Sequence, residues 1–414
     1  MRTDPVAAWA ASGAMWLSRD AAGVPQCAPG SPAGLVVSAL DDLGLDLNGA
    51  SLLGERAALA ALPPAARCSA GRAARILPSS DGDVALSLAR PDDTDLVGAL
   101  VGREIAGDPW HAAARWLAEQ RSGEAVARAQ LLGLPAAVVP QPGDTFDEQA
   151  LARGGIRPAV VTQGGARRHR RSRPLVVDLS ALWAGPLCAH LLGLLGAQVV
   201  KVEGADRLDG ARNGASAFYG LLHAGHESVR VDLRSAAGIE RLRRLLRRAD
   251  LVIEASRPRA LIQLGLDAME FVDNGTSWLS VTAYGRTGPW SNRVGFGDDV
   301  AAGAGMVART QTGISFLGDA LADPMTGVFA AHVAVEALRS EHARLLDVSM
   351  RDVVASTLGP MPEHEVRQTG HDTWEVTTAS GRCAVMPPRP PAPRGPAGPA
   401  PVPGEHNDRW LGER

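Results

Sequence analysis

Cysteine, lysine and aromatic residues are scarce in this chain of 414 residues. No apolar run is long enough to cross a bilayer, and the first residues lack the apolar stretch of a signal peptide. We therefore expect a cytoplasmic protein without a membrane partner. The few cysteines are scattered without metal-ligand spacing, which fits a reducing compartment better than a disulfide framework: Cys27, Cys68, Cys188 and Cys383.

The chain also lacks the motifs of several large enzyme classes. It has no Gly-x-Gly-x-x-Gly after its first core strand, no phosphate-binding Gly-Lys-Ser/Thr and no Gly-x-Ser-x-Gly turn, so NAD, P-loop ATP and serine-hydrolase chemistry lose their main support. The dispersed histidines show no zinc spacing. A net charge of −3 gives no reason to expect a nucleic acid partner. We therefore expect neither a metal nor a tightly bound cofactor.

What is present is a βαβ signature in residues 174–204. An apolar strand over Leu175–Leu179 precedes a helix that starts at Gly185-Pro186 and is closed by Gly196, and a second strand covers Gln198–Glu203. Proline suits a first helical turn, where its missing N–H would be unpaired anyway. The segment predicts a parallel sheet and a helix N-terminus beside strand ends, where α/β proteins hold anionic ligands.

Repetition of this pattern predicts an α/β fold with a Rossmann-like, doubly wound parallel sheet over residues 174–360. Residues 1–140 predict a smaller α/β domain, with a hairpin at the Asp81-Gly82 turn. Residues 141–173 read as a basic, glycine-rich linker, and 361–414 as a proline-rich C-terminal tail laid across a domain or subunit. The basic run 167–173 and the arginine face of 241–248 could contact phosphate or nucleic acid. We expect both to be solvent-exposed surfaces instead.

The candidate catalytic groups of this chain are carboxylates. Asp298 and Asp299 lie between glycines, just before a helix of small residues whose N-terminus would stabilise negative charge. The alternative is that one of the two caps the helix. A second acidic segment holds Asp319 and Asp323, and for Asp323 we expect a plain N-cap role before Pro324.

Together these segments resemble the family III CoA-transferases, which include formyl-CoA transferase-like enzymes, carnitine CoA-transferases and α-methylacyl-CoA racemases. The resemblance covers roughly residues 174–355. It rests on Val177-Asp-Leu-Ser with Ala184-Gly-Pro, Gly196-Ala-Gln-Val-Val-Lys-Val-Glu203, Ser228-Val-Arg-Val-Asp-Leu, Ala249-Asp-Leu-Val-Ile-Glu-Ala-Ser-Arg-Pro258, Tyr284-Gly-Arg-Thr-Gly-Pro289 and Asp347-Val-Ser-Met350. Residues 1–140 look like the segment that such proteins usually carry after the core, so the domain order looks rearranged.

The resemblance implies an interlocked homodimer that moves CoA between an acyl-CoA and a small carboxylate. In this family an aspartate attacks the thioester and passes through acyl-anhydride and enzyme-CoA thioester states. If this chain's aspartate is shifted by one residue relative to the family motif, Asp298 takes that role, and we prefer it to Asp299. Arg257 and Arg212 match family arginines that suit the CoA phosphates, with Ser256 beside Arg257.

The chain also departs from the family pattern. Phe296 stands where the racemases have their histidine, which disfavours an acyl-CoA racemase or isomerase. Ala255 replaces an asparagine and His226 a lysine, so a non-catalytic CoA-binding homologue is the main alternative to a CoA-transferase.

Overall fold

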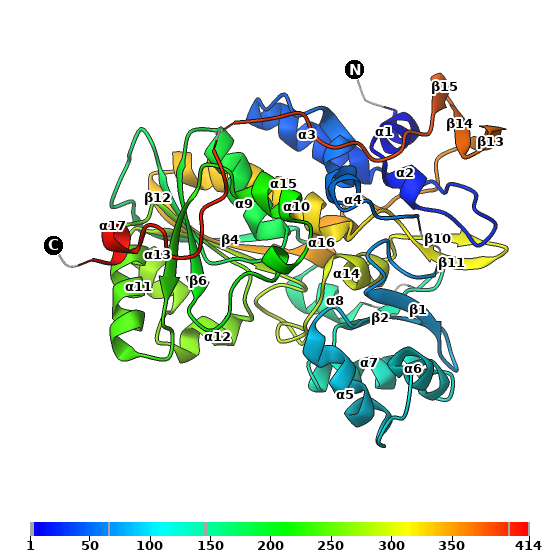
Figure 1. Cartoon of the computed structure of the whole chain (residues 1–414), viewed down its shortest axis with the longest axis horizontal. Helices are drawn as coiled ribbons and strands as arrows, with labels where there is room; N and C mark the ends of the chain where they lie inside the picture. Colours follow the sequence, from blue (N-terminus) through cyan, green and yellow to red (C-terminus); the bar gives the residue numbers. More distant parts are fainter. Residues whose placement is uncertain (1–3, 65–66, 145–146, 396–397, 413–414) are drawn as a thin grey trace.

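The computed structural model describes residues 4–64, 67–144, 147–395 and 398–412. A central sheet has the strand order β4-β12-β9-β8-β5-β6-β7 (Figure 1). Every neighbouring pair is parallel except β4 and β12. The α/β fold with a mostly parallel sheet is thus confirmed. The strand bounds are β4 Ala159–Ala166, β5 Leu175–Asp178, β6 Gln198–Gly204, β7 Glu227–Val231, β8 Leu251–Glu254, β9 Ser277–Thr282 and β12 His342–Ser349.

The βαβ unit predicted from 174–204 forms the middle of this sheet. Strand β5 is buried along its whole length, and helix α9 (Ala184–Leu194) carries Pro186 in its first turn. From β5 the chain builds outward to β6 and β7 on one side, and later to β8 and β9 on the other. Because the winding direction reverses between β5 and β8, a crevice is expected at their carboxyl ends.

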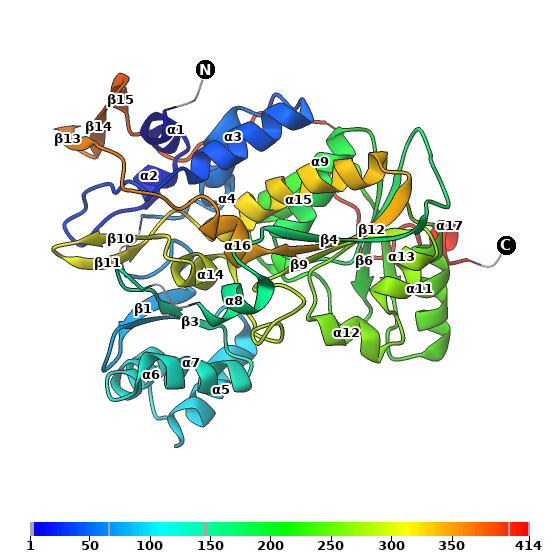
Figure 2. The ribbon, with the colours of Figure 1, turned by 180° about the vertical axis from the view of Figure 1, so that it is seen from behind.

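Helices cover both faces of the sheet (Figures 1 and 2). One apolar core joins α9 to α15 (Ala322–Arg339) and α3 (Pro32–Leu43), and a second core lies under α11 (Ala236–Arg248) and α13 (Ala268–Asp273). The leucines of α11 point into that second core, whereas its arginines face outward. Arg243 and Arg247 lie within 3.6 Å of Glu270 on α13.

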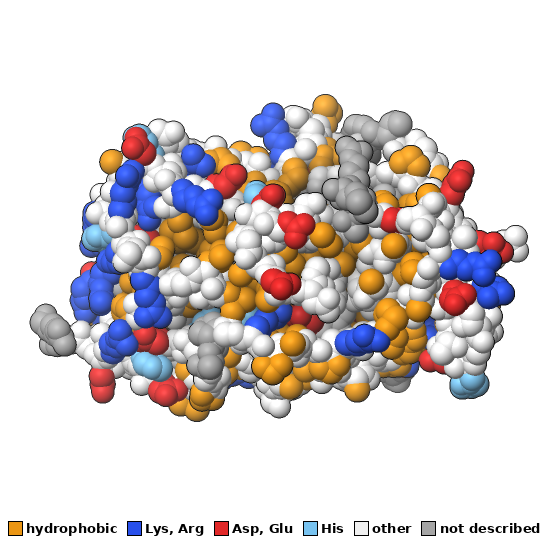
Figure 3. Space-filling model, turned by 90° about the horizontal axis from the view of Figure 1, so that it is seen from above, with side chains coloured by type: hydrophobic (Ala, Val, Ile, Leu, Met, Phe, Trp, Pro, Cys, Tyr) orange, Lys and Arg blue, Asp and Glu red, His pale blue; other side chains and the backbone are white. Residues whose placement is uncertain are grey.

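The face of the molecule shown in Figure 3 carries side chains of both charges. Arginine side chains gather at the left end of the face shown in Figure 3, where other side chains interrupt them. None of the helices in the described ranges is both long and apolar enough to cross a bilayer.

The first half of the chain contributes two packed pieces. Its first part lies along α15 and consists of α1 (Pro5–Ala11), α2 (Ala14–Leu17), α3, the 3-10 helix η1 (Gly49–Gly54) and α4 (Glu55–Leu59). The second part is the predicted hairpin, extended by a third strand and covered by helices: β1 Ala74–Pro78, β2 Asp83–Ser87, β3 Ala136–Val139, α5 Pro91–Val101, α6 Pro109–Leu117 and α7 Ser122–Leu131. A small core joins this sheet to helix α14 (Gly297–Gly303) and to the hairpin of β10 (Val307–Thr310) and β11 (Gly313–Phe316).

Residues 141–173, expected as a linker, instead supply helix α8 (Glu148–Arg153) and the edge strand β4. Strand β4 pairs antiparallel with β12, so its backbone satisfies an otherwise open sheet edge. In the basic run, Arg167 and Arg171 lie 3.3 and 2.7 Å from the buried carboxylate of Asp250. The basic run therefore helps to anchor the edge strand to the core.

The end of the chain is more structured than a simple tail. Three strands form a small antiparallel sheet: β13 Glu365–Gly370, β14 Thr373–Thr378 and β15 Gly381–Ala384. The described parts of the proline-rich segment, residues 387–395 and 398–403, lie between α1 and the edge strand β7, beside which α17 (Asn407–Leu411) is found (Figure 1). This red ribbon links parts of the protein that are distant in sequence.

Candidate active site

Four charged side chains meet where α4, α14 and α15 begin. We call Arg56, Asp298, Asp319 and Asp323 the carboxylate cluster. Arg56 donates from Nε to Oδ2 of Asp319 at 2.9 Å and from Nη2 to the other carboxylate oxygen. Asp319 is fully buried, so this two-bonded pair is the rigid base of the cluster.

Asp298 lies in the first turn of α14 and is half-buried. Its Oδ1 accepts a 2.9 Å hydrogen bond from the backbone N–H of Ala320, and the nearby side chain of Ser69 favours the ionised form and so lowers its pKa. Burial and the negative charge of Asp319 raise the pKa of Asp298 to about 6, while Arg56 opposes the rise. Ala320 has a φ of +42°, a costly conformation for a residue with a side chain, and such strain tends to collect at functional sites.

Asp323 is half-buried and lies in the first turn of α15, an 18-residue helix. The N-cap role expected for it is wrong, because α15 begins at Ala322 and its N-cap is Leu321. Burial raises the pKa of Asp323 to about 7, although Arg56 and a hydrogen bond from the backbone of Ala184 act in the opposite direction. The helix N-terminus also favours a negative charge at this position.

Gly297 lets the two aspartates approach each other. A side-chain carbon at residue 297 would collide with Oδ2 of Asp323 and with the carbonyl oxygen of Ala320. Gly297 therefore makes room for the carboxylate of Asp323.

Asp299 has a different position from its neighbour. Its carboxylate is fully buried and accepts hydrogen bonds from the backbone N–H of Phe296 at 3.0 Å and from Ser87 Oγ at 2.7 Å. Burial raises its pKa to about 7. Asp299 thus caps α14, which was the alternative expected for one of the pair.

The predicted phosphate-binding residues contact groups outside the carboxylate cluster. Arg257 is exposed and is the N-cap residue of α12 (Pro258–Gln263), directly after β8. Ser256 donates to Glu254 at 2.7 Å. Arg212, in the 3-10 helix η2 (Gly210–Asn213), binds both carboxylate oxygens of Glu203 at 2.8 and 2.6 Å. The guanidinium of Arg257 is therefore exposed to solvent, whereas that of Arg212 is engaged by Glu203.

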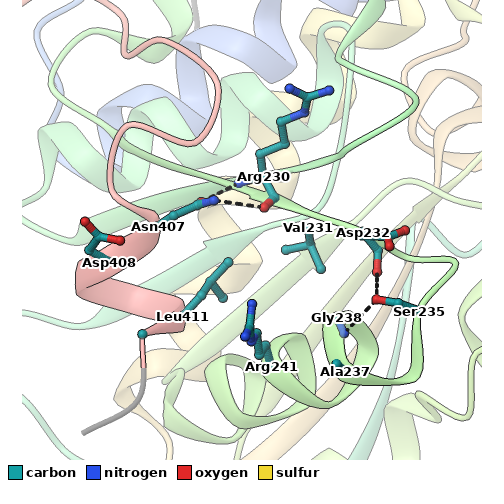
Figure 4. Close-up of a pocket in the computed structure, with 11 residues that line it drawn as sticks. Arg230, Val231, Asp232, Ser235, Ala237, Gly238, Arg241, Asn407, Asp408 and Leu411 are labelled. Carbon is teal, nitrogen blue, oxygen red and sulfur yellow. Dashed lines mark hydrogen bonds between the residues drawn. The ribbon is translucent and has the colours of Figure 1, made fainter.

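A surface cavity of about 480 Å³ lies elsewhere, between the start of α11 and α17 (Figure 4). Asn407 hydrogen-bonds the backbone of Arg230 there, and Ser235 caps α11. None of the sequence-predicted site residues lines this cavity. Two further helices complete the core region: α10 (Ser216–His223) contacts α9, and α16 (Met350–Ala355) directly follows β12.

The sequence pointed to Asp298 and Asp319 as members of acidic segments but missed Arg56 and Ser69. Arg56 is 263 positions from Asp319, in a segment without a recognised motif. The backbone of Ala184, which lowers the pKa of Asp323, lies in the Ala184-Gly-Pro piece of the βαβ unit, so the opening motif also contributes to the electrostatics of the cluster.

Comparisons with known proteins show a family and several relatives that this chain resembles. The family model described as CoA-transferase family III matches residues 174–384, half of the chain. A succinyl-CoA–D-citramalate CoA-transferase of Chloroflexus aurantiacus is 31% identical over 226 residues, covering 49% of this chain and 55% of that protein. A succinate–glutarate CoA-transferase of Agrobacterium fabrum is 29% identical over 205 residues, covering 44% and 51%.

Among solved structures, a crystal structure of Rv3272 from Mycobacterium tuberculosis is 31% identical, with a TM-score of 0.42, and covers 46% of this chain and 56% of that one. The chain spans about half the length of the curated relatives it matches. The family match runs from the start of β5 to the end of β15 and includes Asp298, Asp319 and Asp323. This chain belongs to CoA-transferase family III.

Proposed function

We propose that the protein is an acyl-CoA:carboxylate CoA-transferase whose reacting group is a half-buried aspartate of the carboxylate cluster. Family membership supports CoA transfer in general, and several relatives are named as CoA-transferases that use succinyl-CoA. The observation that carries the proposal is the placement of Asp298 and Asp323 side by side, half-buried, each at the start of a helix. Carboxylates that are positioned and partly stripped of water are workable nucleophiles.

The proposed reaction balances without an oxidant or a metal. A carboxylate oxygen of the aspartate attacks the thioester carbonyl carbon and the C–S bond breaks. The CoA thiolate departs, and an acyl-aspartyl anhydride is formed. The thiolate attacks the aspartyl carbonyl, which releases the first carboxylate product and forms an enzyme-CoA thioester. The acceptor carboxylate then attacks the thioester carbonyl, the C–S bond breaks, and a second anhydride forms between the acceptor and the aspartate. The released thiolate attacks the acceptor's carbonyl carbon in that anhydride, which forms the new acyl-CoA and frees the aspartate.

Two carboxylates compete for the nucleophilic role. Asp298 was favoured from sequence, yet its Oδ1 is engaged in bracing the strained Ala320. Asp323 has the higher pKa, about 7, and lies at the N-terminus of the longer helix. Because Oδ1 of Asp298 is already engaged and the N-terminus of α15 favours a negative charge at Asp323, we propose Asp323 as the attacking group and Asp298 as its alternative. First-turn amides from Gly297 onward would meet the developing oxyanion.

For CoA itself we propose a site along the carboxyl ends of β6 and β8. Arg257 would meet a phosphate group, with Ser256 beside it, and Arg212 would do so only by sharing or leaving Glu203. We further propose a cytoplasmic homodimer, with residues 1–140 standing in for the segment that the family usually carries after the core. Size-exclusion chromatography with light scattering tests the dimer.

The decisive test is to trap the covalent states. The protein is incubated with a panel of acyl-CoAs that starts with succinyl-CoA, and with citramalate, malate and glutarate as acceptors. Hydroxylamine then converts an aspartyl anhydride or thioester to a hydroxamate, and peptide mass spectrometry locates it. We expect modification at Asp323, and loss of both modification and transfer in Asp323→Asn.

Each other outcome has a clear meaning. Modification at Asp298, together with an active Asp323→Asn variant, would restore the residue favoured from sequence. Absence of any adduct and of transfer across the panel, with CoA still bound in calorimetry, would establish the non-catalytic alternative. Asp299→Asn is the matched control, because it changes a capping carboxylate of the same helix turn.

A further inference from the structure

The proline-rich segment places one arginine inside the protein, directly behind the carboxylate cluster. Arg394 donates from both terminal nitrogens to the two carboxylate oxygens of Glu55, each at 2.8 Å. Its Nε donates to Nε2 of His190 on α9 at 3.0 Å. The side chains of Arg394 and Glu55 are only 8% and 5% exposed, so this is a buried ion pair rather than a surface contact.

The partner of Arg394 is the immediate neighbour of the cluster's only cation. Glu55 and Arg56 open α4, a helix of five residues. A helix this short is not stable alone and takes its position from its contacts. Glu55 is anchored by Arg394 on one side, and Arg56 reaches Asp319 on the other. The Arg394 pair therefore fixes the backbone that presents Arg56.

The segment around Arg394 is also held on both sides. The N–H of Met386 donates to the carbonyl of Ala10 at 2.9 Å, and Pro388 lies so close to Gly13 that an added side-chain carbon there would be 2.7 Å from its Cα. Further along, the carbonyl of Pro401 accepts from Arg212 at 3.3 Å. Proline-rich backbone is extended before it docks, so ordering it costs little entropy. We call the described residues 386–395 and 398–401 the strap, and these contacts hold it on both sides of Arg394.

We infer that Arg394 is a positioning residue for the carboxylate cluster, acting through Glu55 and Arg56 from the other end of the chain. The inference rests on the proposed function, because it assigns to the strap the task of holding the cluster in its reactive form. Removing Arg394 leaves Glu55 buried without its cation and frees α4 to shift, which withdraws Arg56 from the aspartates.

The expected consequence is a change in ionisation as well as in rate. Asp298 faces Asp319, Arg56, the Ala320 amide and Ser69, and Asp323 faces Arg56, Asp298, Asp319 and the Ala184 amide. In both sets Arg56 is the only group that carries a positive charge. Withdrawing it raises both pKa values, so the acidic limb of the kcat profile moves to higher pH. A purely structural role would lower the amount of folded protein without moving that limb.

The test compares Arg394→Met with Arg394→Lys and with Arg389→Met, a matched change at an exposed arginine of the same segment. For Arg394→Met we expect kcat to fall about 10- to 100-fold, KM for acyl-CoA to change less than about twofold, and the limb to move up by about half a pH unit or more. Arg394→Lys should recover part of kcat, and Arg389→Met should match wild type. A folded Arg394→Met protein with the wild-type kcat and limb would overturn the inference.

Two further measurements cover the other cases. If Arg394→Met does not fold, the double variant Glu55→Met/Arg394→Met removes both buried charges, and we expect it to fold yet keep the low kcat and the shifted limb. If the wild type transfers no CoA, the proposed function fails, but carbodiimide modification of Asp298 and Asp323 against pH still reports their titration. An unchanged titration in the variant would then refute the positioning role.

Discussion

Lys201 and Arg56 each hold several carboxylates inside the protein, but the two groups are built differently. Lys201, the only lysine in the chain, lies 2.9 Å from Asp209 and 3.4 Å from Asp178, and all three side chains are fully enclosed. Arg56 faces three aspartates, of which only Asp319 is fully buried and doubly bonded to it. The carboxylates of the Lys201 group are all enclosed and paired with its ammonium. The Arg56 group has two more carboxylates, Asp298 and Asp323, which are half-buried and not paired with the arginine in this way.

This difference separates holding the fold from preparing chemistry. Asp178 lies on β5, Lys201 on β6 and Asp209 in the loop after β6, and these three residues tie the central βαβ unit together. The carboxylate cluster instead draws on segments more than 200 positions apart and raises the pKa of two aspartates towards neutrality. Titratable groups with pKa values near the working pH are typical of active sites.

The largest effect on stability is expected from Lys201→Met. This change leaves two buried aspartates without their cation, and such uncompensated charges cost about 3–5 kcal/mol. Urea unfolding followed by circular dichroism should show most of the stability lost, or no folded protein at all. A loss below about 1 kcal/mol would show that the Lys201 group is not structural.

Arg56→Met should break the second group in a different way. We expect kcat to fall at least about 100-fold, because the aspartates lose the cation that keeps them ionised. Buried Asp319 also loses its partner, which should lower the free energy of unfolding by about 1–3 kcal/mol. Arg56→Lys retains the positive charge but not the two-pronged guanidinium, so its kcat should lie between those of wild type and Arg56→Met. Wild-type kcat in a folded Arg56→Met protein would remove this arginine from the site.

Gly297→Ala tests the close approach of the two aspartates. The added methyl group would displace Asp323 and the Ala320 carbonyl, so we expect about a 10-fold or larger loss of kcat and about 1–3 kcal/mol of stability. Gly123→Ala on α7 is the control, since no atom lies within 4 Å of the added carbon. That control should leave kcat unchanged and stabilise the helix slightly.

The smallest effect is expected at the proposed CoA site. Arg257→Ala should raise KM for acyl-CoA about 10-fold and leave kcat nearly unchanged, because a phosphate contact is equally strong in the ground and transition states. Initial rates across a range of acyl-CoA concentrations separate the two parameters. A fall in kcat alone would place Arg257 beside the reacting atoms instead.

The same contrast explains what could be predicted from the sequence. The Lys201 group lies within a continuous βαβ pattern whose apolar runs, Gly-Pro start and closing glycine determine the local fold. The hairpin at Asp81-Gly82 was predictable for the same reason. Local patterns report local structure, and both of these features are local.

The carboxylate cluster could be predicted only in part. Asp298, Asp319 and Asp323 lie within short acidic motifs, but nothing in the sequence around Arg56 shows that α4 packs against them. The edge strand β4 was missed because the glycines and arginines around it resemble a linker. Tertiary pairing with β12 outweighs that local composition.

The pH dependence of stability in Asp323→Asn tests most directly whether the cluster keeps surplus acid for function. A raised carboxylate pKa contributes stability below the usual value near 3.8 and loses it as pH rises through about 7. Asp323→Asn has no carboxyl group to ionise at this position, so the variant does not lose this stability as the pH rises. At pH 8 we therefore expect it to be inactive and about 1–2 kcal/mol more stable than wild type, with the difference vanishing near pH 4. An inactive variant that is less stable at pH 8, or one that retains activity, would contradict this account.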